Sequence, residues 1–164
     1  MRKKSKYRPK GVRLDNMAWV TSGMKTVDQV EDAGLVLRIK NHAALTSIVK
    51  GTANRTDIDT VIGAFNMTEA FARKCKIGQQ YLSEIRAAQD AVLSLSRRGV
   101  QNGDRFIFNA AEMKAVNLGM EIHDAQLDIA TVRELEIAMD FIDQEIRNKR
   151  ARAIVQGISA LTKE

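Results

Sequence analysis

The two histidines are the residues with the most versatile chemistry in this chain, because imidazole can transfer protons and bind metals near neutral pH. His123 adjoins Asp124 and lies two residues after Glu121. A carboxylate-bridged metal site in a helical bundle needs Glu-x-x-His on two helices, whereas the order here is Glu121-x-His123. His42 has no glutamate three residues before it. We therefore expect His123 to be a hydrogen-bonded histidine at a helix interface, and we predict no metal and no cofactor.

Cys75 is the only cysteine, so an internal disulfide and a thiolate-rich zinc site are both excluded. It lies between Lys74 and Lys76, whose charges could lower the pKa of the thiol and favour the nucleophilic thiolate. Nothing else in the sequence supports a nucleophile there. We interpret Cys75 as a free thiol near a helix end.

The sequence contains no recognisable catalytic motif. A glycine-rich dinucleotide loop after a strand, a phosphate-binding Walker loop and a Gly-x-Ser-x-Gly elbow are all missing. Asp57 and Asp59 form a carboxylate pair, but side chains two residues apart diverge around a helix, and acids in a first turn stabilise the helix dipole. We therefore predict a non-enzymatic protein with no catalytic residues.

The strongest candidate for a binding site is the N-terminal arm, residues 1–13, which carries seven cations and no acid. Such a segment buries too little apolar surface to fold alone, so we expect it to be disordered until it meets an anionic partner. Its cations could neutralise phosphates while its tyrosine stacks on an exposed base. A solvated tail that only aids solubility is the alternative. The predicted nucleic-acid-binding residues of the arm are Arg2, Lys3, Lys4, Lys6, Tyr7, Arg8, Lys10 and Arg13.

The rest of the chain is not basic. The whole protein has a net charge of +6, yet residues 14–146 hold 14 cations and 19 acids, a net charge of −5. A second basic cluster follows at Arg147, Lys149, Arg150 and Arg152, where the C-terminal end of a helix already favours cations. We add these four residues to the predicted nucleic-acid site, because the two clusters would form one anion-binding groove if the fold brings them together.

Composition predicts one domain that does not enter a membrane. Apolar residues make up 45% of the 164 residues and charged residues 28%, and no apolar run approaches the ~20 residues that span a bilayer. The segment 14–20 after the basic arm is too short and too polar for a signal peptide, so we expect a cytoplasmic location. We divide the chain into the arm 1–13, a helical domain 14–153 and a C-terminal tail 154–164.

The elements expected to position these residues are helices, because the 155 residues after Pro9 contain no further proline. A short helix is expected near residues 15–23, and Trp19 is expected to be a packing anchor that ties the arm to the helical body. An amphipathic helix over residues 33–50 has apolar residues at Leu35, Ile39, Ala43, Ile48 and Val49 and stops at Gly51. The capping signal Thr56-x-x-Asp59 begins the next helix, which ends before Gly78.

A third helix is expected from Gln79 or Gln80 to Arg98, followed by a small hairpin or an extended loop near residues 100–108. Asn109-x-x-Glu112 then caps a long stretch that is compatible with a helix to about Ala153. It is predicted as one helix or as two, with Gly119 and the pair Thr131-Val132 as kink sites. Its apolar stripe should bury against other helices. The expected fold is all-α, an antiparallel bundle of about four main helices including a long C-terminal one.

Several segments resemble small uncharacterised helical proteins of tailed bacteriophages and prophages. The resemblance involves residues 2–10, which read Arg-Lys-Lys-Ser-Lys-Tyr-Arg-Pro-Lys, together with residues 39–45, 51–53, 57–59 and 123–128. It implies a phage-encoded protein in the cytoplasm of a bacterial host and carries no catalytic residues over to this chain.

Three functions are compatible with this pattern. The first is a helical binding protein whose basic arm contacts DNA, RNA or a nucleoprotein. The second is a protein-protein effector that inhibits a host enzyme or a host defence complex, with the arm providing electrostatic steering. The third is a structural or assembly protein of the virion. The long last helix also allows a homo-oligomer.

Overall fold

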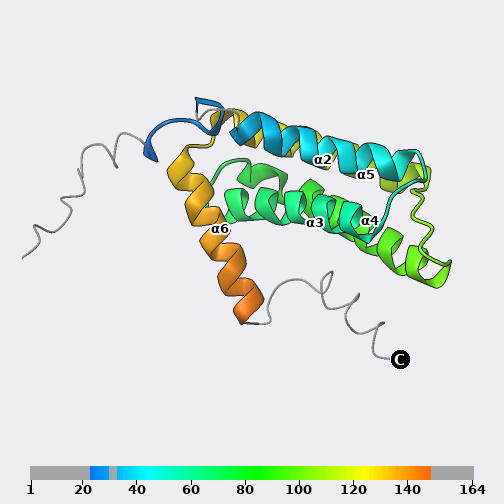
Figure 1. Cartoon of the computed structure of the whole chain (residues 1–164). Coiled ribbons are helices and arrows are strands. Elements are labelled where there is room, and N and C mark those ends of the chain that lie inside the picture. The colour runs from blue at the N-terminus through cyan, green and yellow to red at the C-terminus, as the bar shows by residue number, and fades with distance from the viewer. Residues whose placement is uncertain (1–22, 30–32, 149–164) are drawn as a thin grey trace, which may run out of the picture.

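The computed structural model describes residues 23–29 and 33–148 (Figure 1). The N-terminal arm, Trp19, Lys149, Arg150, Arg152 and the tail 154–164 lie outside the described residues. Within them the chain is mostly helical and has no β-strand, which confirms the all-α prediction at this level. The helical elements are η1 (Val27–Gln29), α2 (Ala33–Val49), α3 (Arg55–Ala70), η2 (Phe71–Cys75), η3 (Gln79–Tyr81), α4 (Leu82–Gln101), α5 (Ala110–Ile129) and α6 (Val132–Arg147).

Local capping signals fix the starts of two helices. The predicted box at Asn109 and Glu112 is confirmed, because the Asn109 side chain accepts from the Glu112 N–H and the Glu112 carboxylate accepts from the Asn109 N–H, both at 2.9 Å. The predicted box at Thr56 and Asp59 is wrong. Asn54 is the N-cap of α3 and pairs reciprocally with Asp57, so the cap lies two residues earlier than expected.

The predicted long C-terminal helix is two helices in the described chain. Ala130 ends α5 in an extended conformation, and the Thr131 hydroxyl accepts from the Glu134 N–H to start α6. The break is at the predicted β-branched pair, whereas α5 passes through Gly119 without interruption. Backbone bonds from Val27 N to Ala130 O and from Val132 N to Lys25 O, both 2.9 Å, hold the break against the start of the described chain.

The segment between α4 and α5 is an extended loop, and the hairpin alternative is wrong. α4 continues to Gln101, three residues past the predicted end at Arg98, and residues 105–109 contain no strand. Asp104 closes the turn by donating its N–H to the Gly99 carbonyl at 2.8 Å. Phe106 then folds back into the core, where it is 2% exposed.

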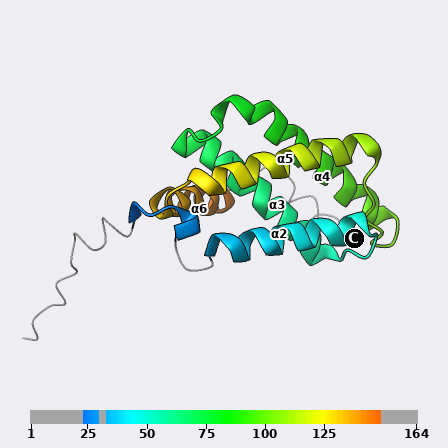
Figure 2. The same cartoon turned by 90° about the horizontal axis from the view of Figure 1, so that it is seen from above.

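α3 packs against α2, α4, α5 and α6, so it lies at the centre of the described structure (Figure 2). Its Phe65 is fully buried among apolar residues of α2, α4 and α5, in the larger of the core clusters. A second cluster, which includes Val27, Phe71, Leu127 and Ala138, joins the start of the described chain to the end of α5 and to α6. No helix in the described part of the chain is long and apolar enough to cross a membrane.

Two predicted apolar faces do not match the observed burial. On α2, Ile48 is buried as expected, but Leu35, Ile39 and Val49 are all more than half exposed. The buried face of α2 is instead formed by Gly34, Asn41, Ala44, Leu45 and Ile48. On α6 only Ala138 is fully buried, while Met139 and Ile146 are half exposed. Sequence periodicity could not identify the α2 face because this helix is apolar on both sides.

Gly119 and Gly63 give a matched pair of predictions, since both lie inside helices. A Cβ at Gly119 would stand 2.6 Å from Ala88 Cβ and 2.8 Å from Phe65 Cε1, whereas nothing lies within 4 Å of a Cβ at Gly63. We expect Gly119→Ala to lower the free energy of unfolding by about 1–3 kcal/mol, because α4 and α5 must separate. Gly63→Ala should raise it by about 0.5–1 kcal/mol through helix propensity. Urea denaturation measures both, and equal effects would contradict the close helix packing.

Candidate functional site

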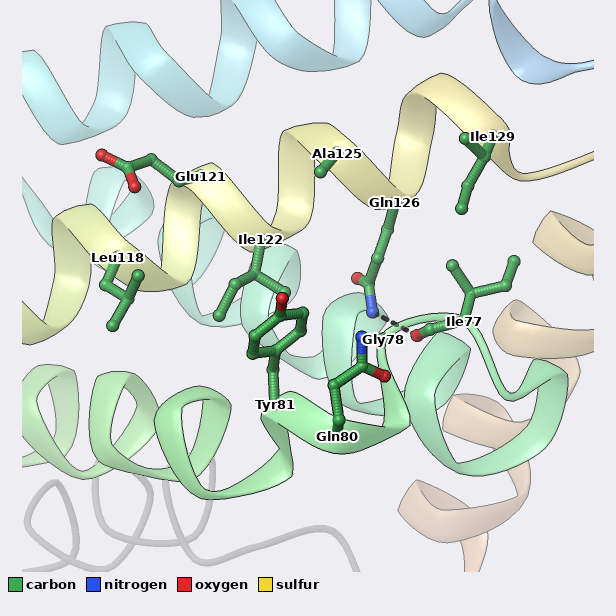
Figure 3. Close-up of a pocket in the computed structure, with 10 residues that line it drawn as sticks. All are labelled: Ile77, Gly78, Gln80, Tyr81, Leu118, Glu121, Ile122, Ala125, Gln126 and Ile129. Carbon is green, nitrogen blue, oxygen red and sulfur yellow. Dashed lines mark hydrogen bonds between the residues drawn. The ribbon is translucent and has the colours of Figure 1, made fainter.

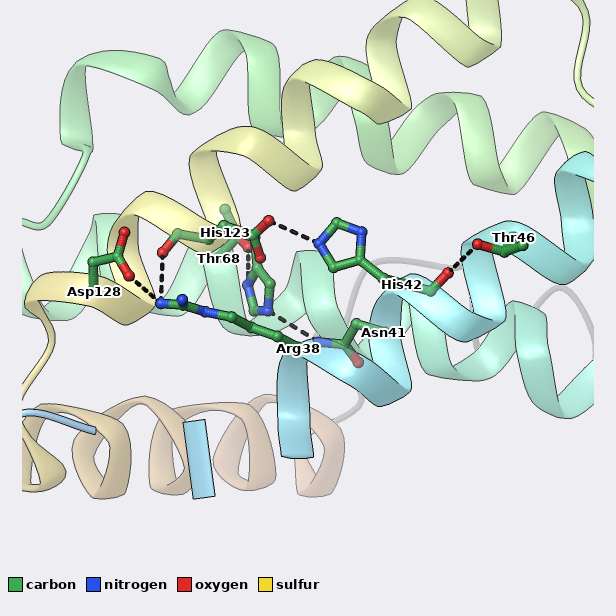
Figure 4. Close-up of polar contacts among 8 residues, drawn as sticks. Arg38, Asn41, His42, Thr46, Thr68, His123 and Asp128 are labelled. Atoms are coloured by element: carbon green, nitrogen blue, oxygen red, sulfur yellow. Dashed lines mark hydrogen bonds and ion pairs between the residues drawn. The ribbon is translucent and has the colours of Figure 1, made fainter. Parts of the chain in front are cut away.

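A buried polar network joins α2, α3 and α5 around His123 (Figure 4). The His123 side chain is fully buried, with Nε2 3.0 Å from the Asn41 amide nitrogen and Nδ1 2.9 Å from the Thr68 hydroxyl. Asn41 and Thr68 are themselves buried. The predicted role of His123 as a hydrogen-bonded histidine at a helix interface is therefore confirmed.

The hydrogen bonds specify the tautomer of this imidazole. The Asn41 amide donates, so Nε2 of His123 is the acceptor. The Thr68 hydroxyl gives its proton to the Ala64 carbonyl at 2.9 Å, so its oxygen accepts from Nδ1–H of His123. Desolvation lowers the pKa of His123 to about 4, and the positive charge of Arg38 acts in the same direction. His123 is thus neutral at pH 7, and its side chain is buried where it borders a cavity between α2 and α3.

The exposed edge of this network consists of charged contacts between α2 and α5. His42 Nε2 lies 2.8 Å from an Asp124 carboxylate oxygen, and Arg38 forms an ion pair with Asp128. Arg38 also donates to the Asp124 backbone carbonyl at 3.4 Å. Both histidines of the chain are therefore engaged in pairing these two helices. Within the described residues no group of three or more His, Cys, Asp or Glu side chains is arranged to hold a metal ion.

A second charged contact locks the loop between α4 and α5. Arg98 binds both oxygens of the Glu112 carboxylate, at 2.8 and 2.6 Å, and donates to the Ile107 carbonyl at 2.9 Å. The hydrogen bond from Arg98 is the main reason that the pKa of Glu112 is lowered. Because Glu112 also caps α5, this pair ties the end of one helix to the start of the next. Its role is structural, although it resembles the paired charges of many active sites.

Cys75 is the last residue of the π-helical turn η2, and its environment opposes the thiolate. Burial raises the pKa of the thiol, and the charge of Glu134 raises it further, so the suggestion that neighbouring lysines could activate Cys75 is not supported. The thiol is free and half-buried. The same turn places the cations of Arg73 and Lys74 over the Phe141 ring, 5.1 and 4.4 Å from its centre, which holds η2 against α6.

An apolar groove of about 340 Å³ runs beside α5 (Figure 3). Gln126 closes its base by donating to the Ile77 carbonyl at 2.8 Å and to the Thr68 carbonyl at 3.1 Å. Gly78 is required here, because its φ is +74° and a Cβ would approach the Gln126 amide nitrogen to 3.0 Å. The other lining residues are Gln80, Tyr81, Leu118, Glu121, Ile122, Ala125 and Ile129.

We could not predict this groove from the sequence, although the sequence did indicate a local role for one of the residues that line it. Gly78 was predicted only as a helix stop, and Leu118 and Ile129 have no special spacing. Leu118 is 43% exposed and Ile129 is 62% exposed, which leaves apolar side chains at the rim of the groove. The groove arises because η3 turns the chain back toward α5, and this contact between distant segments has no local sequence signal.

Of the twelve predicted nucleic-acid-binding residues, the described structure contains only Arg147, which is exposed in the last turn of α6. The other eleven lie outside the described residues, so the proximity of the two basic clusters stays a prediction. A scan with models of protein families, a search of curated proteins and a search of solved structures each found no match to this chain.

Proposed function

We propose that this protein is a non-enzymatic helical binding protein whose basic N-terminal arm contacts nucleic acid or a nucleoprotein, in the host-cell setting that its phage-like segments imply. The helices form a bundle that serves as a scaffold for the arm. The observation that carries the proposal is the segregation of charge, since residues 1–13 hold seven cations and no acid while residues 14–146 have a net charge of −5.

The geometry of the described residues supports a binding role over a catalytic one. The groups that suggested chemistry have structural partners: His123 is neutral and buried, Glu112 is held by Arg98, and the Cys75 thiol has a raised pKa. Asp57 caps α3. Clustered cations remain the feature of the chain with the clearest ligand, because Lys and Arg side chains gain affinity for phosphates by releasing counterions.

The experiment that tests the proposal is direct binding of the purified, nuclease-treated protein to fluorescently labelled DNA and RNA of random sequence. We expect binding at low salt to both single- and double-stranded forms, with little dependence on base sequence. The absence of binding to any of these probes at low salt would exclude the function. Nuclease treatment is needed because copurifying nucleic acid would occupy the arm.

The groove beside α5 favours protein recognition as a second candidate function. Its apolar walls and the exposed side chains of Leu118, Ile129 and Tyr81 suit an apolar side chain of a partner protein. Glu121, at the same rim, is placed to accept a hydrogen bond from that partner. This is the geometry expected of the effector alternative, in which the helical body rather than the arm makes the specific contact.

Leu118→Glu provides the test of this second function. We expect the variant to lose a protein that the wild-type chain captures from nuclease-treated bacterial lysate, because a carboxylate in the groove opposes burial of an apolar side chain. Ser94→Glu, on an exposed position of α4, is the matched control and should retain capture. Equal capture by all three proteins would show that the groove is not the binding surface.

A further inference from the structure

The outward face of α2 is apolar, exposed and free of acids. Leu35, Val36 and Ile39 are 57%, 59% and 59% exposed, although large aliphatic residues are usually buried. Lys40 and Ala43 are exposed beside them. No Asp or Glu occurs between Ala33 and Val49. We call the residues Leu35, Val36, Ile39, Lys40 and Ala43 the α2 face.

The outward face of α6 has the opposite charge. Met139 and Ile146 are 53% and 50% exposed, and the acids Glu136, Asp140 and Asp143 are exposed around them. Among the described residues, none of these three acids takes part in an ion pair. At 100° per residue the five side chains occupy one continuous side of the helix. We call Glu136, Met139, Asp140, Asp143 and Ile146 the α6 face.

The two faces match in length, spacing and charge. α2 has 17 residues and α6 has 16, so each is about 25 Å long at 1.5 Å per residue. On the α2 face the apolar residues recur at three- and four-residue steps, and on the α6 face Met139 and Ile146 are seven residues, about two turns, apart, so both sets project from one side of their helix. A lysine flanks the apolar residues of the α2 face, and three carboxylates flank those of the α6 face.

One molecule cannot bring the two faces together. Figure 1 shows α6 leaving the end of the molecule where α2 begins and running away from α2. We propose that the α2 face of one copy of this chain binds the α6 face of a second copy. Pairing of two α6 faces is opposed by their carboxylates, and pairing of two α2 faces would leave those carboxylates without a cationic partner, so the contact joins unlike faces, head to tail. Because each copy carries one face of each kind, the contacts close when two copies exchange both faces or when a ring forms, and otherwise extend into filaments.

This inference does not depend on the proposed nucleic-acid function, and its test uses nuclease-treated protein without any added nucleic acid. Sedimentation velocity of the full chain should show assemblies that grow with protein concentration and shrink as salt is raised, since charge complementarity contributes to the contact. A protein that stays monomeric at every soluble concentration and at low salt would overturn the proposal.

Two blocked variants make the test specific for a head-to-tail contact. Ile39→Asp places a carboxylate on the α2 face, and the double change Asp140→Lys and Asp143→Lys reverses the charge of the α6 face. Each variant alone should have a self-association constant that is lower than that of the natural chain by about tenfold or more. Mixed in equal amounts, they should form a one-to-one dimer that grows no further, because one intact α2 face then meets one intact α6 face.

Other occupants of the two faces give different results. The α6 face could instead be occupied by the basic arm of the chain. In that case deletion of residues 2–13 removes self-association, or Ile39→Asp leaves self-association unchanged, and the proposal fails. If like faces pair with like, one of the two blocked variants keeps the full self-association of the natural chain on its own and mixing adds nothing, which also overturns the proposal. All the substituted positions are exposed, and unchanged helical circular dichroism verifies folding. Val36→Asp is an independent α2 variant should Ile39→Asp reduce the helical signal.

Discussion

Deletion of residues 2–13 is expected to weaken binding to duplex DNA by about a hundredfold or more near ~0.1 M salt, because the arm supplies most of the phosphate contacts. The deleted segment contains all seven cations that precede residue 14, and what remains up to residue 146 has a net charge of −5. Loss of the arm therefore removes attraction and leaves a body that repels phosphate. Fluorescence anisotropy with a labelled duplex measures the change.

Two controls separate the charge of the arm from its sequence and from the fold. A shuffled arm with the same composition should bind as well as the natural one, since phosphate contacts do not depend on the order of the cations. Thermal unfolding of the deleted protein should match that of the full chain. If the shuffled arm loses binding as completely as the deletion, the arm recognises its partner by specific contacts and the electrostatic account is wrong.

Acidification from pH 6.5 to about 4 is expected to cost the protein about 3 kcal/mol of stability through His123 alone. The folded state holds the pKa of this imidazole at about 4, against an ordinary value of 6.5. Between these two pH values the His123 imidazole is protonated in the unfolded chain but not in the folded protein, so the free energy of unfolding falls as the pH falls. Above pH 6.5 the contribution is complete, and below pH 4 it declines no further.

The structural reason is that a protonated His123 would have no acceptor at Nε2. That nitrogen faces the amide donor of Asn41, and the ring is fully buried. Urea denaturation at intervals between pH 7 and 4.5 measures the effect. The lowered pKa of Glu112 adds a loss of stability that begins only as the pH falls below about 4.5, the ordinary value for this group, so it stays outside the measured range.

Substitution of each histidine in turn shows which imidazole causes this pH dependence of stability. His123→Gln keeps an acceptor for Asn41 and a donor for Thr68 but cannot titrate, so its stability should be lower at pH 7 and nearly constant down to pH 4.5. His42→Gln removes the exposed histidine and should leave the decline in place. A decline that persists in His123→Gln and disappears in His42→Gln would show that the buried imidazole is not its source.

The parts of this structure that could be predicted from the sequence are those set by neighbours in the chain. Asn109 and Glu112 are three residues apart, and their capping box follows from local geometry alone. Gly51 ends α2 with a φ of +70°, as its position after an apolar helix indicated. The break before α6 was one of two sites predicted, because the β-branched pair Thr131-Val132 marks it while Gly119 does not interrupt a helix.

The remaining features depend on contacts between distant segments. Periodicity placed Leu35 and Ile39 on the buried side of α2, but which side is buried depends on where α3 and α5 pack. An interface role for His123 was predictable from its helical setting, whereas its partners Asn41 and Thr68 lie 82 and 55 residues away. The π-turn at Phe71–Cys75 and the groove beside α5 likewise follow from packing against α6 and η3.

The central claim is that the arm binds nucleic acid as a cluster of independent cations, and the salt dependence of binding tests it most directly. The slope of log Kobs against log salt for B-DNA is about −0.9 per phosphate contact, so seven cations predict a slope about 6 units steeper for the full chain than for the protein lacking residues 2–13. A difference of about 4–6 would support the claim. Equal slopes for the two proteins, or no measurable binding by the full chain at low salt, would contradict it.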